Sequence, residues 1–382
     1  MVDSKILSIL SKEGIRQADT IELIASENFA SDAVMQLSGS IFTNKYAEGY
    51  PGKRYYNGCE HADEIEQLAI DTLTKLYGAN FANVQPHSGA NANLAVFKAF
   101  LTPGDVVLGM DLASGGHLSH GASVNISGAW FNSHSYGVDA NGYLDYDAIR
   151  DKALDLQPKM IIAGASAYPR QIDWAKFRNI ADEVGALLLV DMAHYSGLIA
   201  GAAYDSPIEY ADIVTSTTHK TLRGPRGGII LWNNEHYTKK INSAIFPGTQ
   251  GGPLMHIIAA KAQCFIEAST DDFKDYARHV VHNAQTMCGV FKQRGIPVLT
   301  SGTDSHIILM DLSNSQYSGR EFADLLEANG ITVNKNGVPN DPRSFVETSG
   351  IRIGTAAETT RGHSDIFFIK LAHRIADLLE AK

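Results

Sequence analysis

The hexapeptide TSTTHK at residues 215–220 places one lysine, Lys220, among groups that can change its chemistry. Small hydroxyl residues and an imidazole, His219, precede the lysine, and the glycine-rich loop RGPRGG (223–228) follows at once. These residue types indicate a polar, tightly turned pocket, in which a lysine can lose its proton and act as an amine nucleophile. The alternative is a solvated lysine in a surface loop, which is the usual state of this residue.

An aspartate upstream favours the chemical interpretation. The electrophile that suits an amine nucleophile is an aldehyde cofactor, pyridoxal phosphate, held as a Schiff base. Asp191 ends the apolar run ALLLV (186–190), and a carboxylate at the end of a buried strand needs a cationic or donor partner. In pyridoxal phosphate enzymes this partner is the protonated ring nitrogen. Asp191 could instead cap the helix that follows it.

Four further features could complete such a site. Ser88-Gly89 opens a helix within 86–101, where free N–H groups and the helix dipole favour a phosphate. His117 follows two glycines and could stack on the cofactor ring, although a lone histidine is usually structural. Arg352 could hold a substrate carboxylate through two hydrogen bonds, or form a surface salt bridge. Glu48, in the tyrosine-rich segment 43–61, could move protons near the substrate.

Apolar strands bring these residues to one edge of a sheet. The runs MIIAGAS (160–166) and ALLLVDMAH (186–194), with an amphipathic helix between them, predict a βαβ unit in a parallel sheet. Ligands of such sheets bind at the carboxyl ends of the strands. Ser166, Asp191 and His194 stand at those ends, and TSTTHK follows a third strand at 211–215.

The remaining patterns predict three segments. We expect an N-terminal arm at 1–50, a large cofactor-binding domain at 51–268 and a smaller α+β domain at 269–382. The expected elements include helices at 3–19, 62–77, 270–294 and 364–380, and strands at 81–85, 106–110, 296–300 and 349–355.

Composition excludes several classes of function. With 382 residues, 44% hydrophobic and 19% charged, the chain can bury the large cores of a globular enzyme. A net charge of −10 argues against a general binder of nucleic acid or anionic membranes. The three cysteines are widely spaced and show no metal-ligand pattern, which predicts reduced thiols in the cytoplasm. We expect neither a signal peptide nor a membrane span.

Long motifs in the sequence resemble one family, serine hydroxymethyltransferase, from residue 21 to about 362. The resemblance implies the α/β fold of type I pyridoxal phosphate enzymes, with a large, mostly parallel sheet domain and a smaller α+β domain. It implies an enzyme of one-carbon metabolism that interconverts serine plus tetrahydrofolate with glycine plus 5,10-methylenetetrahydrofolate. It also implies a homodimer with shared active sites. The matching segments are IELIASEN, TNKYAEGYPGKRYYNG, NVQPHSGANAN, VLGMDLASGGHLSHG, VDMAH, TTHKTLRGPRGG, FPGTQGGP, ITVNKNGVPNDP and TSGIRIGT.

The same resemblance implies roles for individual residues. Lys220 resembles the lysine that carries the cofactor, and Asp191 the partner of its ring nitrogen. The catalytic set is completed by Glu48, His219 and Tyr56. The other implied cofactor ligands are His117, Ser166, His194, Ser88, Gly89 and Arg226, with Tyr46, Gly251 and Gly252 supplied by the neighbouring subunit, as is Tyr56. The implied substrate ligands are Arg352, Ser26, Glu48, Tyr56 and His194, and the folate ligands are Glu48, Tyr55, Leu112, Gly116, His117 and Asn336.

The sequence departs from the family pattern at three positions and at its end. Ala90 stands where many relatives carry a serine, which removes one hydrogen bond from the phosphate site. Ala356 and Glu358 replace a proline and an aliphatic residue, and Glu358 could alter packing or substrate preference near Arg352. Many relatives also continue with a further helix.

Two other functions compete with the transferase. The first is folate-independent aldol cleavage of a β-hydroxy amino acid, which Lys220 and Arg352 would serve equally well. Glu48, Tyr55 and Asn336 favour the transferase, because an aldolase need not retain them for folate. The second is a cofactor-bound scaffold or RNA-binding regulator without catalysis. The filled catalytic positions and the net charge of −10 disfavour it.

Overall fold

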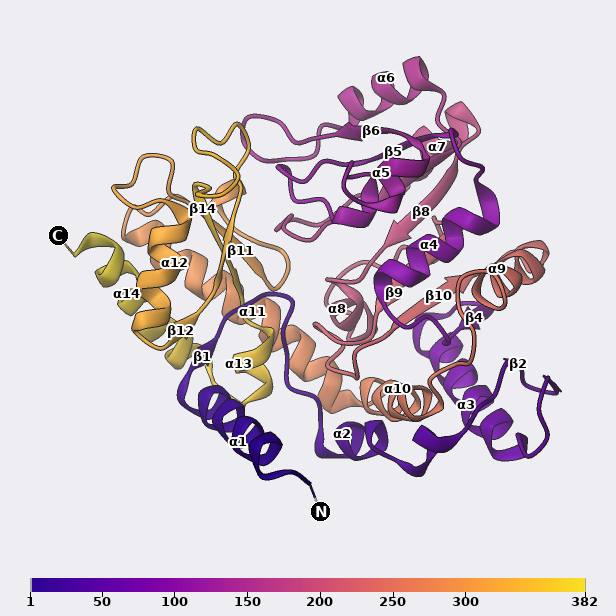
Figure 1. Cartoon of the computed structure of the whole chain (residues 1–382). Coiled ribbons are helices and arrows are strands. Elements are labelled where there is room, and N and C mark those ends of the chain that lie inside the picture. The colour runs from indigo at the N-terminus through magenta and orange to yellow at the C-terminus, as the bar shows by residue number, and fades with distance from the viewer. Residues whose placement is uncertain (1, 382) are drawn as a thin grey trace.

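A seven-stranded sheet forms the centre of the structure, a computed structural model that describes residues 2–381 (Figure 1). The strands β9, β8, β7, β5 and β6 lie side by side in this order and pair in parallel, whereas β10 is antiparallel to its two neighbours, β9 and β4. The sheet is therefore mixed but mostly parallel, which confirms the predicted α/β class. The strand order is β4 (Phe81–Asn83), β10 (Gly228–Trp232), β9 (Ile213–Thr217), β8 (Leu187–Asp191), β7 (Met160–Ala163), β5 (Val106–Met110) and β6 (Asn132–Tyr136).

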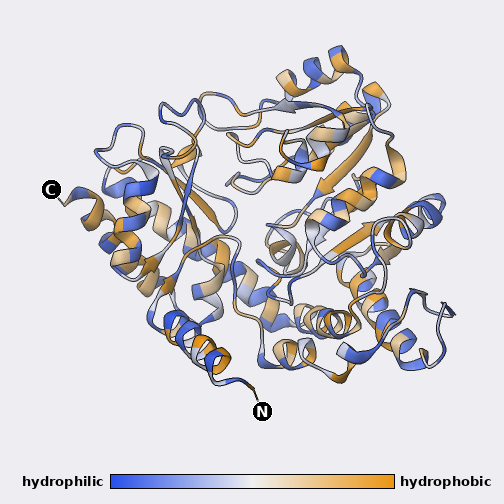
Figure 2. Ribbon diagram, in the orientation of Figure 1, coloured by the Kyte–Doolittle hydropathy of each residue, from blue (hydrophilic) through white to orange (hydrophobic). Residues whose placement is uncertain are grey.

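Both faces of the central sheet are covered at its inner strands, which explains why β7, β8 and β10 are mainly apolar, whereas the edge strand β6 is polar. Along β8, Leu188 and Val190 join one hydrophobic cluster, and Leu189 points into a second cluster on the opposite face. Side chains alternate along a strand, so a strand buried on both faces needs apolar residues at every position. Figure 2 shows β8 and β10 in the hydrophobic colours. The helices of this region are α3 (Glu60–Tyr77), α4 (Gly89–Phe100), α5 (Ile126–Trp130), α6 (Tyr146–Leu156), α7 (Trp174–Val184), α8 (Ser196–Ala200), α9 (Thr238–Ile245) and α10 (Met255–Ala268).

A smaller antiparallel sheet lies in the C-terminal part of the chain, drawn orange to yellow in Figure 1. Its strand order is β11 (Ile307–Asp311), β14 (Gly350–Gly354) and β13 (Asn334–Asn336), and helices pack on it to form a separate core. This confirms the predicted smaller α+β unit. The helices of this part are α11 (Asp271–Gln293), α12 (Gly319–Ala328), α13 (Ala356–Thr360) and α14 (Asp365–Glu380).

The strand predicted at 296–300 is wrong. Residues Leu299–Ser301 form a short 3-10 turn, in which Thr300 and Ser301 have positive φ angles of 58° and 55°. Arg170 holds this turn by donating from Nε to Thr300 Oγ1 at 3.1 Å. The local sequence is apolar and favours an extended strand, but the hydrogen bond from Arg170 of the large unit stabilises a turn instead.

The N-terminal arm connects the two units. Helix α1 (Ser4–Asp19) has no buried residue among those described, and β1 (Ile21–Glu22) pairs in parallel with β12 (Ile331–Thr332) of the C-terminal part. Helix α2 (Asp32–Ser38) then packs against α10 of the large unit.

Residues 1 and 382, the ends of the first and last predicted segments, lie outside the described residues. The short elements are η1 (Ile41–Asn44), β2 (Gly49–Tyr50), β3 (Lys53–Arg54), η2 (Leu118–His120) and η3 (Glu235–Tyr237). Across residues 2–381, the helices are too short or too polar to cross a membrane.

Glu358 has a clear structural role in fastening the arm. Its carboxylate is fully buried and accepts a hydrogen bond from the backbone N–H of Glu22 in β1 at 2.7 Å. It also accepts one from Nη1 of Arg361 at 2.8 Å. The acidic residue that departs from the family pattern thus joins α13 to β1.

We expect Glu358→Ala to lower the free energy of unfolding by about 2 kcal/mol, because a buried N–H loses its acceptor and a partly buried arginine loses its carboxylate partner. Urea denaturation measures this change. Glu13→Ala is the matched control: Glu13 forms the same i,i+3 pair with Arg16, but both side chains are exposed, so the midpoint should hardly move. Equal effects of the two variants would contradict the assigned role.

Candidate active site

A cavity of about 490 Å³ opens at the carboxyl ends of β7, β8 and β9 and faces β14 of the smaller unit. The strands end there side by side, so the residues that follow them meet although they are far apart in sequence. Twelve predicted site residues line this cavity, and Asp191 lies in a smaller adjoining recess with Lys220. The twelve are Ser26, Ser88, Gly89, Leu112, Gly116, His117, Ser166, His194, His219, Lys220, Arg226 and Arg352.

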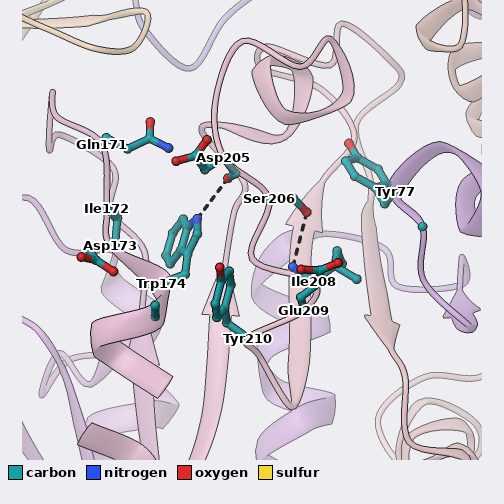
Figure 3. Close-up of a pocket in the computed structure, with 12 residues that line it drawn as sticks. Tyr77, Gln171, Ile172, Asp173, Trp174, Asp205, Ser206, Ile208, Glu209 and Tyr210 are labelled. Atoms are coloured by element: carbon teal, nitrogen blue, oxygen red, sulfur yellow. Dashed lines mark hydrogen bonds between the residues drawn. The ribbon is translucent and has the colours of Figure 1, made fainter. Parts of the chain in front are cut away.

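A larger surface hollow of about 770 Å³ has a different character (Figure 3). Its described lining contains Asp173, Asp205 and Glu209 and no lysine, arginine or histidine. A phosphate or carboxylate would meet only like charge there. The smaller cavity, with its cationic groups, is therefore the candidate for an anionic cofactor or substrate.

Lys220 is strained, buried and easily deprotonated. Its φ angle is 59°, in the left-handed region that few residues other than glycine adopt, which points to a functional constraint. Burial lowers the pKa of its ammonium group to about 8; Asp191 counteracts this, while Arg352 and Arg226 add to it. Asn28 of the arm donates from Nδ2 to the Lys220 carbonyl oxygen at 2.8 Å, which holds the strained backbone in place.

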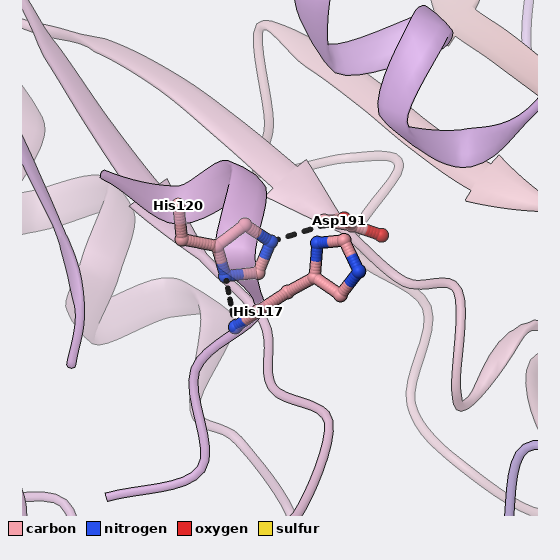
Figure 4. A group of neighbouring side chains, drawn as sticks. All are labelled: His117, His120 and Asp191. Carbon is pink, nitrogen blue, oxygen red and sulfur yellow. Dashed lines mark hydrogen bonds and ion pairs between the residues drawn. The ribbon is translucent and has the colours of Figure 1, made fainter. Parts of the chain in front are cut away.

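Asp191 is held as a carboxylate by a network of donors (Figure 4). Its Oδ2 accepts from Asn93 Nδ2 at 2.9 Å and lies 3.0 Å from His120 Nε2, while Oδ1 accepts from the N–H of Ala193 at 3.1 Å. Burial alone would raise the pKa of Asp191, but the contacts with His120 and Asn93 hold it below its ordinary value. The charged carboxylate can therefore accept one more proton donor from the pocket.

His117, His120 and Asp191 are also close enough to hold a metal ion (Figure 4). The hydrogen bonds favour another role for His120. Its Nδ1 accepts from the backbone N–H of His117 at 3.3 Å, so its proton lies on Nε2 and is donated to Asp191. A protonated nitrogen offers no lone pair to a metal, so this cluster fits a supported carboxylate better than a metal centre.

The first turn of α4 forms an anion cradle in the same cavity. Ser88 caps this helix by accepting from the N–H of Asn91 at 3.2 Å, and the amides of the first turn have no partner within the helix. Gly228 lies against this turn, where a Cβ would overlap the Ser88 carbonyl oxygen. Ala90 lines the cavity. The serine hydroxyl that the family pattern places at this position is therefore absent from the cradle.

A fully buried lysine, Lys261, supports the cradle from behind. Its Nζ donates to the carbonyl oxygens of Val84, Pro86 and Gly228 at 2.7, 3.0 and 2.9 Å. Burial lowers the pKa of Lys261 to about 7, and Glu66 acts in the opposite direction. The side chain ties α10 to the two loops that shape the cradle.

Arg352 enters the cavity from β14 and has no carboxylate partner among the described residues. Its Nε donates to Asn334 Oδ1 at 3.0 Å and its Nη1 to the Ser166 carbonyl oxygen at 2.7 Å. Burial lowers the pKa of Arg352 to about 10. An enclosed guanidinium that contacts only neutral groups can still accept an anion.

The tyrosine-rich segment does not reach this cavity within one chain. Tyr46 and Tyr56 donate to the two oxygens of Glu48 at 3.4 and 3.2 Å, and this cluster lies beside Gly251 and Gly252. Tyr55 is 73% exposed and packs edge-on against Phe246. Asn336 lies on β13, and its Nδ2 donates to the carbonyl oxygen of Gly337. Gly337 in turn lies near Ala113, in the loop that carries Leu112 and Gly116.

The sequence predictions missed the residues that support this site. Asn93, His120, Lys261 and His306 are buried. Asn93 and His120 bond Asp191, His306 contacts His194, and Lys261 bonds the backbone at Pro86, two residues before Ser88. Two signals could have found some of them: His120 stands three residues after His117, and Lys261 is the one lysine in the mainly apolar helix of residues 255–268, where it follows the run IIAA.

Comparison with known proteins gives a consistent picture. The sequence profile of the serine hydroxymethyltransferase family matches residues 1–375. The chain is 57% identical over 379 residues to a serine hydroxymethyltransferase of Thiobacillus denitrificans, covering 99% of this chain and 91% of the relative. It is 55% identical over 381 residues to one of Ehrlichia ruminantium, covering 100% and 90%, and 56% identical to one of Psychrobacter arcticus, covering 100% and 91%.

The lowered pKa of Lys220 predicts an amine that reacts with aldehydes near neutral pH. We expect pyridoxal phosphate, added to cofactor-free protein and trapped with borohydride, to label Lys220 with a pH midpoint near 8, because the neutral amine forms above that pH. Peptide mass spectrometry measures the labelled fraction, and Lys220→Arg is the control that removes the labelled peptide. A midpoint near 10 would show that the pocket does not perturb the amine.

Proposed function

Because this chain belongs to the serine hydroxymethyltransferase family, we propose that the cavity around Lys220 binds pyridoxal phosphate and the carboxylate of serine or glycine. The chain is a pyridoxal phosphate-dependent one-carbon transferase that interconverts serine plus tetrahydrofolate with glycine plus 5,10-methylenetetrahydrofolate. The observation that carries the proposal is the guanidinium of Arg352. It has no carboxylate partner within residues 2–381, and it lines the same cavity as the perturbed amine of Lys220.

The residues present fit the proposed cofactor. Lys220 would hold its aldehyde carbon, Asp191 its ring nitrogen and the first turn of α4 its phosphate. The unpaired, buried Nδ1 of His219 beside Lys220 is consistent with a polar ligand here. When bound, pyridoxal phosphate supplies an electron sink for the bond broken at the substrate Cα.

The proposed role of Arg352 is to orient the substrate. A bidentate pair with the carboxylate fixes the rotation about Cα and so selects which bond is aligned for cleavage. Ser166 and His194 lie beside it in the cavity and would position oxygens of the cofactor and the carboxylate. Asp191, held charged by its donors, would stabilise a positive ring nitrogen.

We further propose that the working enzyme is a homodimer in the cytoplasm. Glu48, Tyr46 and Tyr56 lie outside the cavity of their own chain, which supports their donation to a second copy together with Gly251 and Gly252. The buried, unpaired state of all three cysteines supports a reducing compartment. The proposed domain limits are 1–50, 51–268 and 269–382, although the first part of α11 packs into the larger core.

For the folate, we propose a site formed by Leu112, Gly116, His117 and Asn336 of one chain, with Glu48 and Tyr55 contributing from the dimer partner. Leu112 and Gly116 line the mouth of the cavity, and the strand that carries Asn336 approaches the same loop. An aldolase that acts without folate remains the second candidate, since Lys220 and Arg352 would serve it as well.

Serine–glycine exchange measured with and without tetrahydrofolate tests the assignment. We expect serine turnover to depend on tetrahydrofolate and to fall at least about tenfold in Glu48→Gln, because a group positioned for proton transfer contributes at least that much. Turnover of serine at the full rate without tetrahydrofolate would favour the aldolase. Protein that shows no visible absorbance after incubation with pyridoxal phosphate would refute both functions.

Arg352→Ala should raise the KM for serine about a hundredfold, since an enclosed carboxylate–guanidinium pair is worth about 3 kcal/mol. Steady-state kinetics measures this effect. Arg320→Ala is the control, because Arg320 is exposed and its contact with Glu347 is 3.5 Å long. An unchanged KM in Arg352→Ala would remove the proposed carboxylate site.

A further inference from the structure

A second histidine, His306, lies behind the pocket histidine His194. It precedes β11 in the smaller unit and is fully buried. The two imidazole rings stack with centroids 5.5 Å apart and planes 17° apart. His306 Nε2 also lies 3.1 Å from the carbonyl oxygen of Ala25 in the arm, next to Ser26. The imidazole of His306 therefore contacts the large unit through His194 and the N-terminal arm through Ala25, and both segments border the cavity.

The contacts of His306 determine where its proton lies. A carbonyl oxygen can only accept, so Nε2 of His306 carries the proton that it donates to Ala25. The same nitrogen lies 3.3 Å from Nδ1 of His194. Because a protonated nitrogen cannot accept, Nδ1 of His194 must be the acceptor in this contact. The opposite arrangement would turn two N–H groups toward each other in a buried place, where an unsatisfied donor is costly.

The accepting Nδ1 leaves the proton of His194 on its other nitrogen. Burial lowers the pKa of His194 well below its ordinary value, and the charges of Lys220 and Arg352 lower it further, so the ring is neutral. Burial also lowers the pKa of His306 to about 3. A neutral imidazole has one N–H, which in His194 is then Nε2–H. This nitrogen has no protein hydrogen bond within residues 2–381, and His194 lines the cavity.

We propose that His306 is a positioning residue that fixes the tautomer of His194, so that His194 presents an Nε2–H donor to an anionic oxygen of the bound ligand. That oxygen is either the substrate carboxylate or the phenolic oxygen of the cofactor. Without His306, His194 could adopt the other tautomer and turn a lone pair toward the same anion, which would repel it. Only the identity of the ligand rests on the proposed function; the tautomer follows from the contacts within the chain.

Nitrogen NMR of the full chain, labelled with 15N-histidine and loaded with pyridoxal phosphate, tests the tautomer directly. The signals of His194 are identified by their loss in His194→Asn. We expect the proton of His194 on Nε2, and a wild-type His194 protonated on Nδ1 overturns the proposal. This readout does not require activity, so it stays interpretable if the proposed function is wrong.

Two substitutions separate positioning from packing. His306→Leu fills the space but removes the donor, whereas His306→Gln places an amide N–H near the former Nε2. In His306→Leu we expect His194 to lose its single tautomer, and either the KM for serine or the dissociation constant of pyridoxal phosphate to rise about tenfold, the effect of one hydrogen bond to an anion. The change in kcat should be much smaller, and His306→Gln should restore both readouts.

The two ligand measurements identify the recipient of the hydrogen bond. A change in the KM for serine assigns it to the carboxylate, and a change in cofactor affinity assigns it to the phenolic oxygen. An unchanged tautomer in His306→Leu, or a lower melting temperature without either ligand effect, overturns the proposal. If His306→Leu does not fold, His306→Gln decides: a His194 protonated on Nδ1 in that variant overturns the proposal as well.

Discussion

The cavity encloses more positive than negative charge, and much of the surrounding structure follows from this imbalance. Lys220, Arg226 and Arg352 face it, against one buried carboxylate, Asp191, and the exposed Glu27 at its edge. Enclosing unpaired cations is costly unless neutral donors and acceptors or a ligand compensate. Within the chain, carbonyl and amide oxygens contact Arg352, and the amine of Lys220 releases its proton readily. A ligand with a phosphate and a carboxylate would supply the missing negative charge.

Polar contacts join the two units and the N-terminal arm around the cavity. Arg352 reaches across to the Ser166 carbonyl oxygen, Arg170 contacts Thr300 and Asp304, and His306 contacts Ala25. The two units have distinct apolar clusters, but α11 contributes to both, and Ile307 and Ala356 of the smaller unit belong to the larger cluster. Helix α11 is thus the continuous element that holds the two units together, and the polar contacts fix their orientation at the cavity.

The parts of this arrangement that could be predicted from sequence are those set by local patterns. Buried strands show as apolar runs, and polar residues directly after them identify the functional edge, which is why Asp191, His194 and Lys220 were found together. The turn at Leu299–Ser301 could not be predicted, because Arg170 from the other unit decides its conformation. Asn93 and Lys261 were missed for a related reason. Asn93 bonds Asp191, which is 98 positions away in sequence, and Lys261 bonds the backbone of Val84 and Pro86, which are 177 and 175 positions away. A polar residue within a helix does not reveal such a distant partner.

The Glu48 cluster is ordered although it lies at the surface of the chain and outside the cavity. Tyr46 and Tyr56 pack edge to face with their ring centroids 5.3 Å apart, and both donate to Glu48 although both are exposed. Exposed phenols gain little from such an arrangement in an isolated chain, since water could satisfy the same groups. Holding them in place beforehand does lower the entropy lost when another surface covers them. This entropic argument supports the proposed homodimer, in which the preorganised Glu48 carboxylate would enter the cationic cavity of a second chain.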